Sequence, residues 1–347
     1  MEFRTLGRTG VEVSAFCLGT MMFGPWGNTD EDECVRMIHD ALDAGINFLD
    51  TADVYGEGRS EEIVGKALKG RRDEVVLATK VHGQMGPGRN DRGNSRLWIM
   101  REIESSLRRL GTDHIDLYQI HRPEPDVDLE ETLGALTDLV RQGKIRYLGS
   151  STFPAFHIVE AHWVSERRGL ERFVCEQPPY SIFVRHIEWD VLPVCQHYGM
   201  GVIVWSPLAG GWLAGKYRRG EEVPADSRAR RFAARGSPIA ARYDVTRTEN
   251  RRKLDLVEDM TNLADKAGTS ITAMALAFTL AHPAVTATII GPRTPRQLHD
   301  LLAAADVRLD AETLDAIDEL VAPGSVVFDF DRGWTPPWME APARRRP

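Results

Sequence analysis

The sequence predicts an α/β fold, a closed (β/α)8 TIM barrel, from three observations. Short apolar runs alternate eight times with amphipathic helical segments along the 347 residues. Three of these runs stop at an ionisable side chain, namely Asp50, Lys80 and His121. In a closed barrel the C-terminal ends of the parallel strands meet at one mouth. The main alternative, an open doubly wound sheet, would spread the three side chains along one edge instead.

The chain is expected to open with a β-hairpin, because residues 2–5 and 11–14 flank a segment in which Gly7 and Gly10 suit a tight turn. Each barrel strand is then a short apolar run that ends where polar or glycine-rich residues begin. The eight barrel strands are expected at residues 16–19, 46–50, 75–80, 115–121, 145–149, 173–177, 202–205 and 286–290.

The helices are predicted from apolar residues at helical spacing, such as Val35, Ile38 and Leu42, and from signals at their ends. Ser60, for example, caps a helix whose first turn carries two glutamates. Two of the predicted helices are additional to the strand–helix units. The helices are expected at residues 30–44, 60–68, 96–110, 129–142, 155–168, 188–198, 251–267, 270–281, 295–305 and 310–321.

Two stretches lack a regular pattern. Residues 206–250 are expected to form a long loop after the seventh strand, and such a length is typical of a functional insertion or lid. Residues 323–347 are a Trp- and Pro-rich tail. Residues 1–322 are therefore expected to form a single barrel domain, with the tail packing near the mouth of the site.

The composition argues against several kinds of function. A formal net charge of −8 provides no general cationic surface for nucleic acid or for an anionic membrane. The four cysteines, at positions 17, 34, 175 and 195, lie far apart and outside zinc-ligand spacing, so neither a metal site nor a disulfide framework is expected. No apolar run reaches the roughly 18 residues of a membrane span, so we expect a soluble, cytoplasmic protein. Helices outside a barrel are amphipathic with or without a partner, so the pattern predicts no oligomeric state.

The ionisable residues suit the reduction of a carbonyl group, which needs a general acid beside the oxygen on which charge develops. Tyr55, in the glycine-rich loop after Asp50, is the predicted acid, and the Lys80 ammonium is expected to lower its pKa from about 10. Asp50 is expected to pair with Lys80, and a neutral His121 is expected to orient the carbonyl. The alternative is three unrelated structural features: a buried ion pair, a turn tyrosine and a core histidine.

The segments after the last two predicted strands suit a phosphate-bearing cofactor. Trp205 begins the stretch W-S-P-L-A-G-G, and the stretch G-P-R-T at residues 291–294 opens a helix. Loops after strands seven and eight of a barrel commonly hold phosphate groups, and Arg293 suits a phosphate fork. The alternative is a pair of ordinary turns with an exposed arginine. The stretch G-E-G at residues 56–58 lacks the third glycine of a dinucleotide fingerprint, so a Rossmann site is not expected.

At these residues the sequence resembles the aldo-keto reductase superfamily. The block G-x-N-x-x-D-T-A-x-x-Y-G, the strands A-T-K and I-D-L-Y-Q-I-H, and the segments K-I-R-Y-L-G-S-S, W-S-P-L and I-G-P-R-T-P-x-Q-L occur in the family's order. The resemblance covers residues 1 to about 322 and is nearest to the bacterial and potassium-channel β-subunit-like branch. Two positions depart from relatives: Leu301 replaces a frequent asparagine, and Thr152 replaces an arginine of the channel subunits.

The resemblance implies an NADP-dependent oxidoreductase that reduces a small aldehyde or ketone to an alcohol. Its active site would be the tetrad Asp50, Tyr55, Lys80 and His121. The walls of its substrate site would be Met22, Phe23, Trp26 and His82, together with the 206–250 segment.

The resemblance also implies where the cofactor binds. Gln177 would hold the nicotinamide amide, Trp205 would stack on the nicotinamide ring, and Arg293 would face a ribose 2′-phosphate, which favours NADP(H) over NAD(H). The full set of implied cofactor positions is Thr20, Met21, Ser151, Gln177, Trp205, Ser206, Leu208, Gly210, Lys216, Gly291, Arg293, Gln297 and Asp300.

Two further functions fit the same residues. One is a regulatory subunit that senses NADPH with little turnover, as the channel-associated relatives suggest. The other is a ketoreductase for a keto-sugar or another intermediate of secondary metabolism. The residues of the substrate walls vary too much within such families to name the carbonyl compound.

Overall fold

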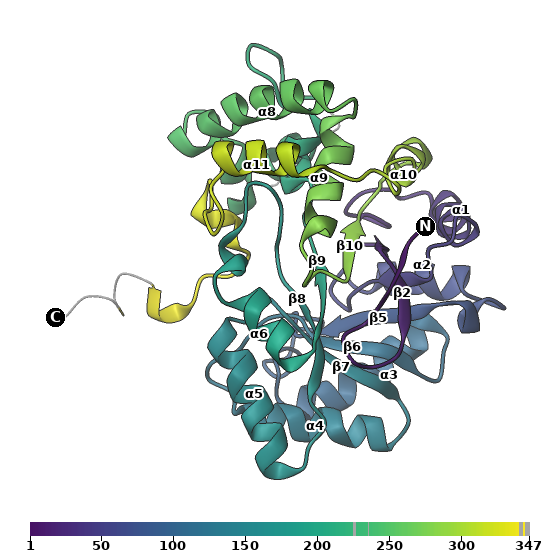
Figure 1. Ribbon diagram of the computed structural model, residues 1–347. Helices are drawn as coiled ribbons and strands as arrows, with labels where there is room; N and C mark the ends of the chain where they lie inside the picture. Colours follow the sequence, from purple (N-terminus) through teal and green to yellow (C-terminus); the bar gives the residue numbers. More distant parts are fainter. Residues whose placement is uncertain (225–226, 235, 340–342, 344–347) are drawn as a thin grey trace. The chain divides into compact units, whose positions relative to one another are not determined.

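The computed structural model describes residues 1–224, 227–234, 236–339 and 343. Eight parallel strands close into a barrel in the order β10-β3-β4-β5-β6-β7-β8-β9 (Figure 1). Each strand pairs with its neighbour along the chain, and β10 closes the ring on β3. The predicted closed barrel is thereby confirmed against the open sheet. The strands are β3 (Phe16–Gly19), β4 (Phe48–Asp50), β5 (Val76–Val81), β6 (Ile115–Ile120), β7 (Ile145–Ser151), β8 (Phe173–Gln177), β9 (Gly201–Val204) and β10 (Ala287–Ile290).

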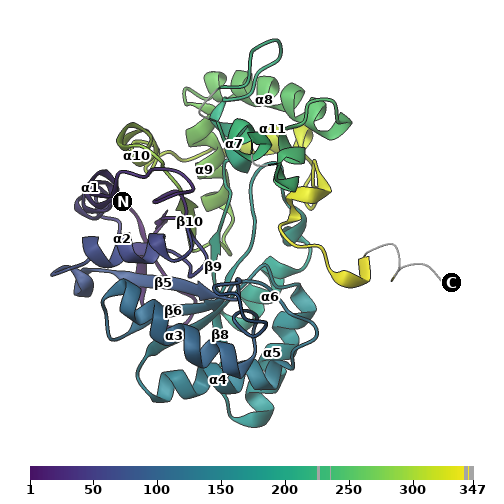
Figure 2. The ribbon, with the colours of Figure 1, turned by 180° about the vertical axis from the view of Figure 1, so that it is seen from behind.

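Helices follow the strands and cover the outside of the barrel, as α2, α3 and α4 do in Figure 2. Asp30, Ser95 and Asp128 each cap a helix by accepting a hydrogen bond from its first turn. The predicted cap at Ser60 is wrong, because that helix begins at Arg59 with Gly58 at its N-cap position and without a side-chain cap hydrogen bond. The Ser60 hydroxyl donates instead to the Thr20 carbonyl at 2.9 Å. The helices that flank the barrel are α1 (Glu31–Asp43), α2 (Arg59–Ala67), η1 (Arg72–Glu74), α3 (Arg96–Leu110), α4 (Leu129–Arg141), α5 (Ala155–Arg168), α6 (Val191–Tyr198) and α10 (Pro295–Leu302).

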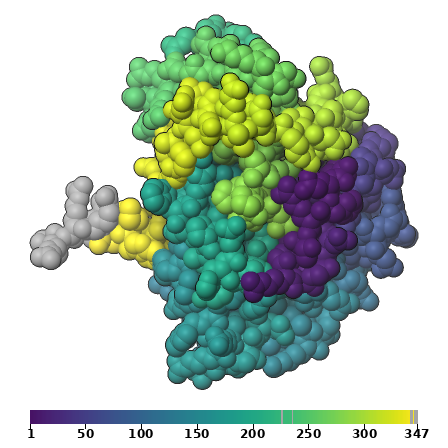
Figure 3. Space-filling model, in the orientation of Figure 1, coloured from purple at the N-terminus to yellow at the C-terminus, as the bar shows by residue number. Residues whose placement is uncertain are grey.

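The predicted N-terminal hairpin, strands β1 (Phe3–Thr5) and β2 (Glu12–Ser14), is confirmed and lies at the surface of the barrel (purple in Figure 3). Leu6 and Val13 of this hairpin are fully buried in one cluster with barrel residues of β3, β4 and β9. The turn approaches the start of β9 so closely that a Cβ on Gly7 would lie 2.6 Å from the Gly199 carbonyl oxygen. The hairpin therefore closes the end of the barrel at which the strands begin.

The chain divides into two compact units. The barrel unit comprises Met1–Pro178, Val191–Trp205 and Pro283–Asp306, and the second unit takes the described parts of Pro179–Asp190, Ser206–His282 and Val307–Pro347. No described helix is both long and apolar enough to cross a bilayer. The helices of the second unit are η2 (His186–Glu188), η3 (Ala209–Ala214), α7 (Arg228–Ala234), η4 (Pro238–Tyr243), α8 (Thr248–Lys266), α9 (Ile271–Ala281), α11 (Ala311–Leu320), η5 (Asp329–Arg332) and η6 (Pro337–Met339).

The 206–250 segment differs from the predicted loop, because it contains η3, α7, η4 and the start of α8. These helices are too short for a periodic pattern, and aromatic packing holds them together. The Trp212 ring is parallel to that of Tyr243 at 6.4 Å and lies 4.8 Å from that of Tyr217. Contacts between distant residues therefore fix a segment that local patterning does not specify.

Asp318, Val321 and Asp331 of the C-terminal segment bind other residues of the second unit. Arg185 donates to a carboxylate oxygen of Asp318 and to the Val321 carbonyl, both at 2.6 Å. Lys253, which is fully buried, donates to Asp331 at 2.5 Å. The predicted packing of the 323–347 tail near the site mouth stays a prediction, and the three terminal arginines lie outside the described residues.

Candidate active site

A buried ion pair between β4 and β5 forms the centre of the site. The Lys80 Nζ atom lies 2.6 Å from Asp50 Oδ2, and the two side chains are 0% and 3% exposed. The ammonium also donates to the Thr51 carbonyl oxygen at 2.8 Å. Burying two charges is costly unless each finds partners, and here the partners are provided.

The second carboxylate oxygen of Asp50 is also satisfied. The side-chain amide of Gln177, at the end of β8, donates to Asp50 Oδ1 at 2.8 Å, and that of Gln119 on β6 donates at 3.3 Å. Gln177 further donates to Gln119 Oε1 at 3.2 Å. The carboxylate is thus fixed from three barrel strands, and this network links β4, β5, β6 and β8.

Tyr55 reaches the ion pair from the loop after β4. Its hydroxyl lies 3.3 Å from Lys80 Nζ, so the ammonium can donate to the phenol oxygen. The half-buried ring packs between two others, with Trp26 at 6.0 Å and the edge of His121 at 5.7 Å and 81°. The structure therefore brings all four members of the predicted tetrad together at the ends of their strands.

Burial and neighbouring groups together set the pKa values of Tyr55 and Lys80. Burial raises the pKa of Tyr55 above its usual value, and the opposing charge of Lys80 reduces that rise without cancelling it. Lys80 thus acts in the expected direction, but burial outweighs it and the pKa of Tyr55 is raised overall. Burial alone would lower the pKa of Lys80, but the neighbouring Asp50 and Tyr55 raise it above its usual value. At neutral pH the phenol keeps its proton and the amine is an ammonium.

His121 is neutral at physiological pH. Burial, followed by the charges of Arg122 and Lys80, holds the pKa of its imidazole well below the usual value. Its backbone N–H donates to the Val81 carbonyl at 3.0 Å, which anchors the end of β6 to the end of β5. A neutral imidazole carries one N–H donor, in agreement with the expected protonation state.

Two residues of this site were given no role from the sequence, although Gln119 lies within the I-D-L-Y-Q-I-H segment. Gln119 precedes His121 by two positions and therefore shares its face of the strand, a signal that alternation along β6 could have supplied. Asn94 is 3% exposed, and its Oδ1 lies 2.9 Å from Nδ1 of His82. Because its Nδ2 donates to the Arg122 carbonyl at 2.9 Å, Asn94 connects the loops after β5 and β6.

Arg122 lies beside the tetrad at the barrel mouth. Its guanidinium donates to Thr152 Oγ1 at 3.3 Å and is 5.7 Å from the centre of the Trp205 ring. Thr152 has φ 61°, an unfavourable value for a β-branched residue. Its N–H donates to the Gln177 carbonyl at 3.1 Å, which helps to hold this conformation.

Glu176 supports the same turn from the opposite face of β8. It is fully buried, accepts hydrogen bonds from the Ser150 hydroxyl and the Phe153 N–H, and burial raises its pKa to about 7. The pairing register of β7 with β8 shifts between Leu148 and Gly149. Glu176 and Gln177 face opposite sides of the strand, so this register determines which of them meets Asp50.

The positions that the resemblance implies for the nicotinamide lie in the barrel unit. Trp205 is half-exposed, and its buried indole N–H meets no acceptor in the described part of the chain. Ser151 is buried and donates to the Gln177 carbonyl at 2.9 Å. Thr20 is fully buried, with its hydroxyl 2.8 Å from that of Ser60, while Met21 is half-exposed.

The positions expected near the adenosine end surround the start of α10. Gln297 folds back, and its Oε1 accepts from the Arg293 N–H at 2.9 Å. Thr294 caps the helix by accepting from the Gln297 N–H at 3.3 Å. Asp300 lies 4.0 Å from Arg296, and Gly291 is exposed. Gln297 therefore shapes the backbone that carries Arg293.

The positions expected to follow the pyrophosphate lie in the second unit. Ser206 and Ala209 have φ values of 62° and 47°, which are uncommon outside glycine. Gly210 has φ 71°, and a Cβ there would lie 2.6 Å from the Tyr243 hydroxyl, which donates to the Gly210 carbonyl. Leu208 and Lys216 belong to the same segment, half-buried and exposed respectively.

The four residues predicted as substrate walls differ in exposure. Trp26 and His82 are partly exposed, and Trp26 packs against Tyr55. Met22 is 5% exposed and Phe23 is fully buried beneath the loop after β3. Only the first pair therefore presents side-chain surface beside the tetrad.

Comparisons with known proteins agree with this geometry. A family model described as the Aldo/keto reductase family matches residues 15–322. The uncharacterized oxidoreductase YrpG of Bacillus subtilis is 42% identical over 331 residues, which cover 92% of this chain and 96% of that protein. A putative voltage-gated potassium channel subunit beta of Schizosaccharomyces pombe is 38% identical over 330 residues, 92% of this chain and 93% of that protein. A probable voltage-gated potassium channel subunit beta of Arabidopsis thaliana is 35% identical over 331 residues, 92% and 97% of the two chains.

Proposed function

Because the chain belongs to the aldo/keto reductase family, a family of oxidoreductases, we propose that it reduces an aldehyde or ketone to an alcohol with NADPH and with Tyr55 as the general acid. The observation that carries this proposal is that Lys80 contacts both Asp50 and Tyr55. The ammonium lies 2.6 Å from the carboxylate and 3.3 Å from the phenol. The Lys80 ammonium thus contacts both Asp50, which fixes its position, and Tyr55, which loses a proton in the proposed reaction.

The roles of the side chains follow from their protonation states. The Tyr55 O–H donates its proton to the carbonyl oxygen as negative charge grows there, and an alkoxide is a far stronger base than a phenolate. The raised pKa of Tyr55 keeps the acid loaded at neutral pH. Lys80 then stabilises the phenolate, while Asp50 holds the ammonium in place. His121, which is neutral, donates a second hydrogen bond to the same oxygen.

Residues of the barrel unit fit the nicotinamide end of a dinucleotide cofactor. The bound cofactor supplies the hydride that adds to the carbonyl carbon. The Trp205 side chain is half-exposed and leaves ring surface on which a nicotinamide can stack. Gln177 Oε1 accepts from no residue that the structure describes, so it is available to the nicotinamide amide. The strained backbone at Ser206 and Ala209 is typical of segments that aim N–H groups at phosphate oxygens.

Arg293 is the residue that we assign to a ribose 2′-phosphate, and this choice makes NADP(H) the cofactor. The Arg293→Leu variant is expected to weaken NADPH binding by about tenfold, equal to about 1.4 kcal/mol, and to leave NADH binding nearly unchanged. Titration of each cofactor by fluorescence measures the two affinities. Arg296→Leu is the matched control, because that side chain is 92% exposed. An equal loss for both cofactors would contradict the assignment.

The decisive experiment replaces the proposed acid. Tyr55→Phe is expected to lower kcat for NADPH-dependent reduction of 4-nitrobenzaldehyde by at least about 100-fold, the usual contribution of general acid catalysis, with NADPH affinity unchanged. Tyr198→Phe is the matched control, since Tyr198 lies on α6 with its ring stacked on His162. Unchanged turnover in Tyr55→Phe would show that another group delivers the proton.

A second candidate function is a regulatory subunit that retains NADPH with little turnover. Two relatives are described as channel β-subunits, and α5 exposes Phe156, Val159 and Trp163 at helical spacing. Negligible turnover of wild-type protein across aldehydes and ketones, with tight NADPH retention, would favour this function. A ketoreductase for keto-sugars remains the third candidate, and activity on such sugars above that on simple aldehydes would favour it.

A further inference from the structure

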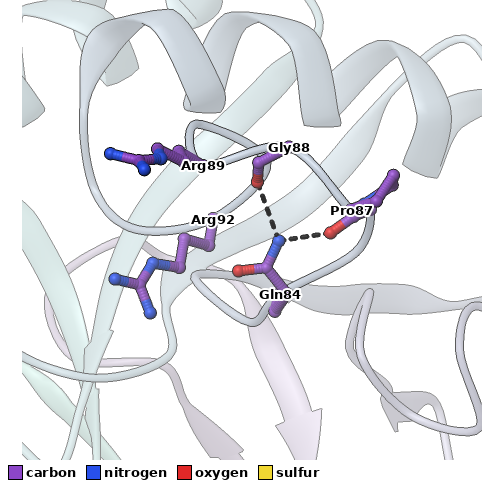
Figure 4. Close-up of a pocket in the computed structure, with 6 residues that line it drawn as sticks. Gln84, Pro87, Gly88, Arg89 and Arg92 are labelled. Atoms are coloured by element: carbon purple, nitrogen blue, oxygen red, sulfur yellow. Dashed lines mark hydrogen bonds between the residues drawn. The ribbon is translucent and has the colours of Figure 1, made fainter.

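The loop between β5 and α3, residues 83–94, borders an open hollow of about 590 Å³ lined by Gln84, Gly86, Pro87, Gly88, Arg89 and Arg92 (Figure 4). Its volume lies within the range of about 300–1,000 Å³ that is common for small-ligand sites. The sequence of the loop, G-Q-M-G-P-G-R-N-D-R-G-N, is rich in glycine and basic in balance. No role in the proposed reaction accounts for it.

Internal hydrogen bonds fix the shape of this loop. The Asp91 carboxylate accepts from the Gly88 N–H at 2.8 Å, and the Gln84 amide donates to the carbonyls of Gly86 and Gly88. A Cβ on Gly86 or Gly88 would lie 2.5 or 2.6 Å from the Asp91 carboxylate. The glycines therefore leave room for the Asp91 carboxylate in the position where it binds the loop backbone.

Two arginines of the loop are left without a partner. Arg89 and Arg92 are both exposed, and within the described residues neither makes an ion pair or a hydrogen bond. Their guanidinium groups extend to the same side of the loop in Figure 4. The one acid of the loop, Asp91, is engaged by backbone N–H and lies 3.6 Å from Arg101 on α3. Two unneutralised cations thus face one hollow of a protein whose net charge is −8.

The loop lies beside the tetrad. It starts three residues after Lys80, and the Gly93 N–H donates to the His82 carbonyl at 2.8 Å, which closes the loop onto the end of β5. A Cβ on Gly83 would lie 2.7 Å from the side chain of Val54, the neighbour of Tyr55. Burial is the main cause of the lowered pKa of His82, and the charge of Arg92 lowers it further. The charge of His82 in turn contributes to the lowered pKa of His121.

We propose that Arg89 and Arg92 bind an anionic group of the substrate, a phosphate or a carboxylate, whose carbonyl end reaches Tyr55. This inference rests on the proposed function and specifies its substrate class as a carbonyl compound with a negatively charged end. Guanidinium groups suit such oxygens because their N–H donors form a fork that matches a carboxylate or phosphate. The glycine-rich backbone lets the anion approach closely.

Paired substrates test this site. Glyceraldehyde 3-phosphate and 4-carboxybenzaldehyde carry the anion, whereas glyceraldehyde and 4-nitrobenzaldehyde are their neutral counterparts. The double variant Arg89→Gln/Arg92→Gln is expected to raise KM for the anionic members by at least about tenfold, equal to about 1.4 kcal/mol. The KM of the neutral members is expected to change less than about twofold. The larger of the two anionic effects identifies phosphate or carboxylate as the natural group.

A charge-matched control separates local binding from the general field of the protein. The variant Arg36→Gln/Arg252→Gln removes two exposed arginines from α1 and α8, and it is expected to leave every KM nearly unchanged. Equal changes in KM for anionic and neutral substrates in the double loop variant, or none, would overturn the inference while the proposed function stands.

A second readout does not depend on turnover. Titration calorimetry with inorganic phosphate is expected to show binding to the wild-type protein and a loss of at least about tenfold in affinity in the double loop variant. If no aldehyde or ketone is reduced, the proposed function fails and this titration alone decides whether the anion site exists. Equal phosphate binding by both proteins would overturn the site.

Discussion

Gln177 and Asp50, which are 127 positions apart in the sequence, are joined by a hydrogen bond of 2.8 Å inside the barrel. The bond places a neutral donor from β8 on the carboxylate that fixes Lys80. It connects a residue expected to hold the cofactor with the residue expected to orient the proton donor. The two halves of the site therefore share one buried network.

Removing the Gln177 amide is expected to destabilise the protein. Gln177→Met leaves Asp50 Oδ1 with only the longer bond from Gln119, and a buried charged acceptor that loses a partner costs about 1–3 kcal/mol. Gln119→Met is expected to cost less, because its bond to Asp50 is 3.3 Å long. Urea unfolding of both variants measures the two costs, and a larger cost for Gln119→Met would reverse the assigned order.

The Asp50–Lys80 pair is expected to be strongly coupled. Lys80→Met leaves a fully buried carboxylate without its cation, and breaking such a pair costs about 3–5 kcal/mol. The double variant Asp50→Leu/Lys80→Met removes both charges and is expected to be more stable than Lys80→Met. A double-mutant cycle of unfolding free energies tests this, and additive costs would mean that the two charges do not interact.

His162 is expected to make the protein less stable in acid. It is 7% exposed and stacks on Tyr198 at 4.1 Å, and burial together with the charge of Arg172 lowers its pKa to about 4. Between about pH 6.5 and about pH 4 the unfolded chain, whose histidines titrate near 6.5, binds more protons than the folded chain. The free energy of unfolding therefore falls as the pH drops through this range.

His162→Phe is expected to flatten that part of the stability profile. Urea unfolding at several pH values between 7 and 4 measures the slope for the variant and the wild type. His197→Phe, which replaces an exposed histidine of α6, is the control and should keep the wild-type slope. An unchanged slope in His162→Phe would mean that other groups cause the acid sensitivity.

Asp331 is expected to hold the C-terminal segment on the second unit. Its carboxylate accepts from the fully buried Lys253 at 2.5 Å and lies 3.1 Å from Arg242. Asp331→Asn leaves the buried ammonium without its counter-charge, so cleavage near residue 331 in limited proteolysis should become at least about tenfold faster. Asp329→Asn is the control, since Asp329 is 85% exposed, and equal rates in both variants would contradict this role.

Much of the barrel could be predicted from the sequence because local patterns specify it. Apolar runs such as the one from Ile115 end at polar residues, and the helices expected at residues 96–110 and 129–142 are Arg96–Leu110 and Leu129–Arg141 in the structure. The pairing of Asp50 with Lys80 followed from the cost of burying a lone carboxylate at a strand end.

The remaining features depend on packing between distant residues. The short helices near Trp212 are held by Tyr217 and Tyr243, and no periodic pattern marks such contacts. The net pKa of Tyr55 depends on how completely its surroundings exclude water, and the nearby ammonium alone gave the wrong sign. Gln119 was missed because its partner Asp50 is distant in the sequence, although it lies within the I-D-L-Y-Q-I-H segment and two positions before His121.

The register shift between β7 and β8 fixes which side chains of β8 point into the barrel, and the site depends on this choice. One residue inserted into β8 ahead of Glu176, without a matching change in the bulge, would turn Gln177 outward and Glu176 inward. A second carboxylate would then face Asp50 across the lumen and compete for the same ammonium. Single-residue insertions or deletions in this strand should therefore abolish turnover even where the polypeptide still folds. The same changes in a surface loop should leave turnover largely intact.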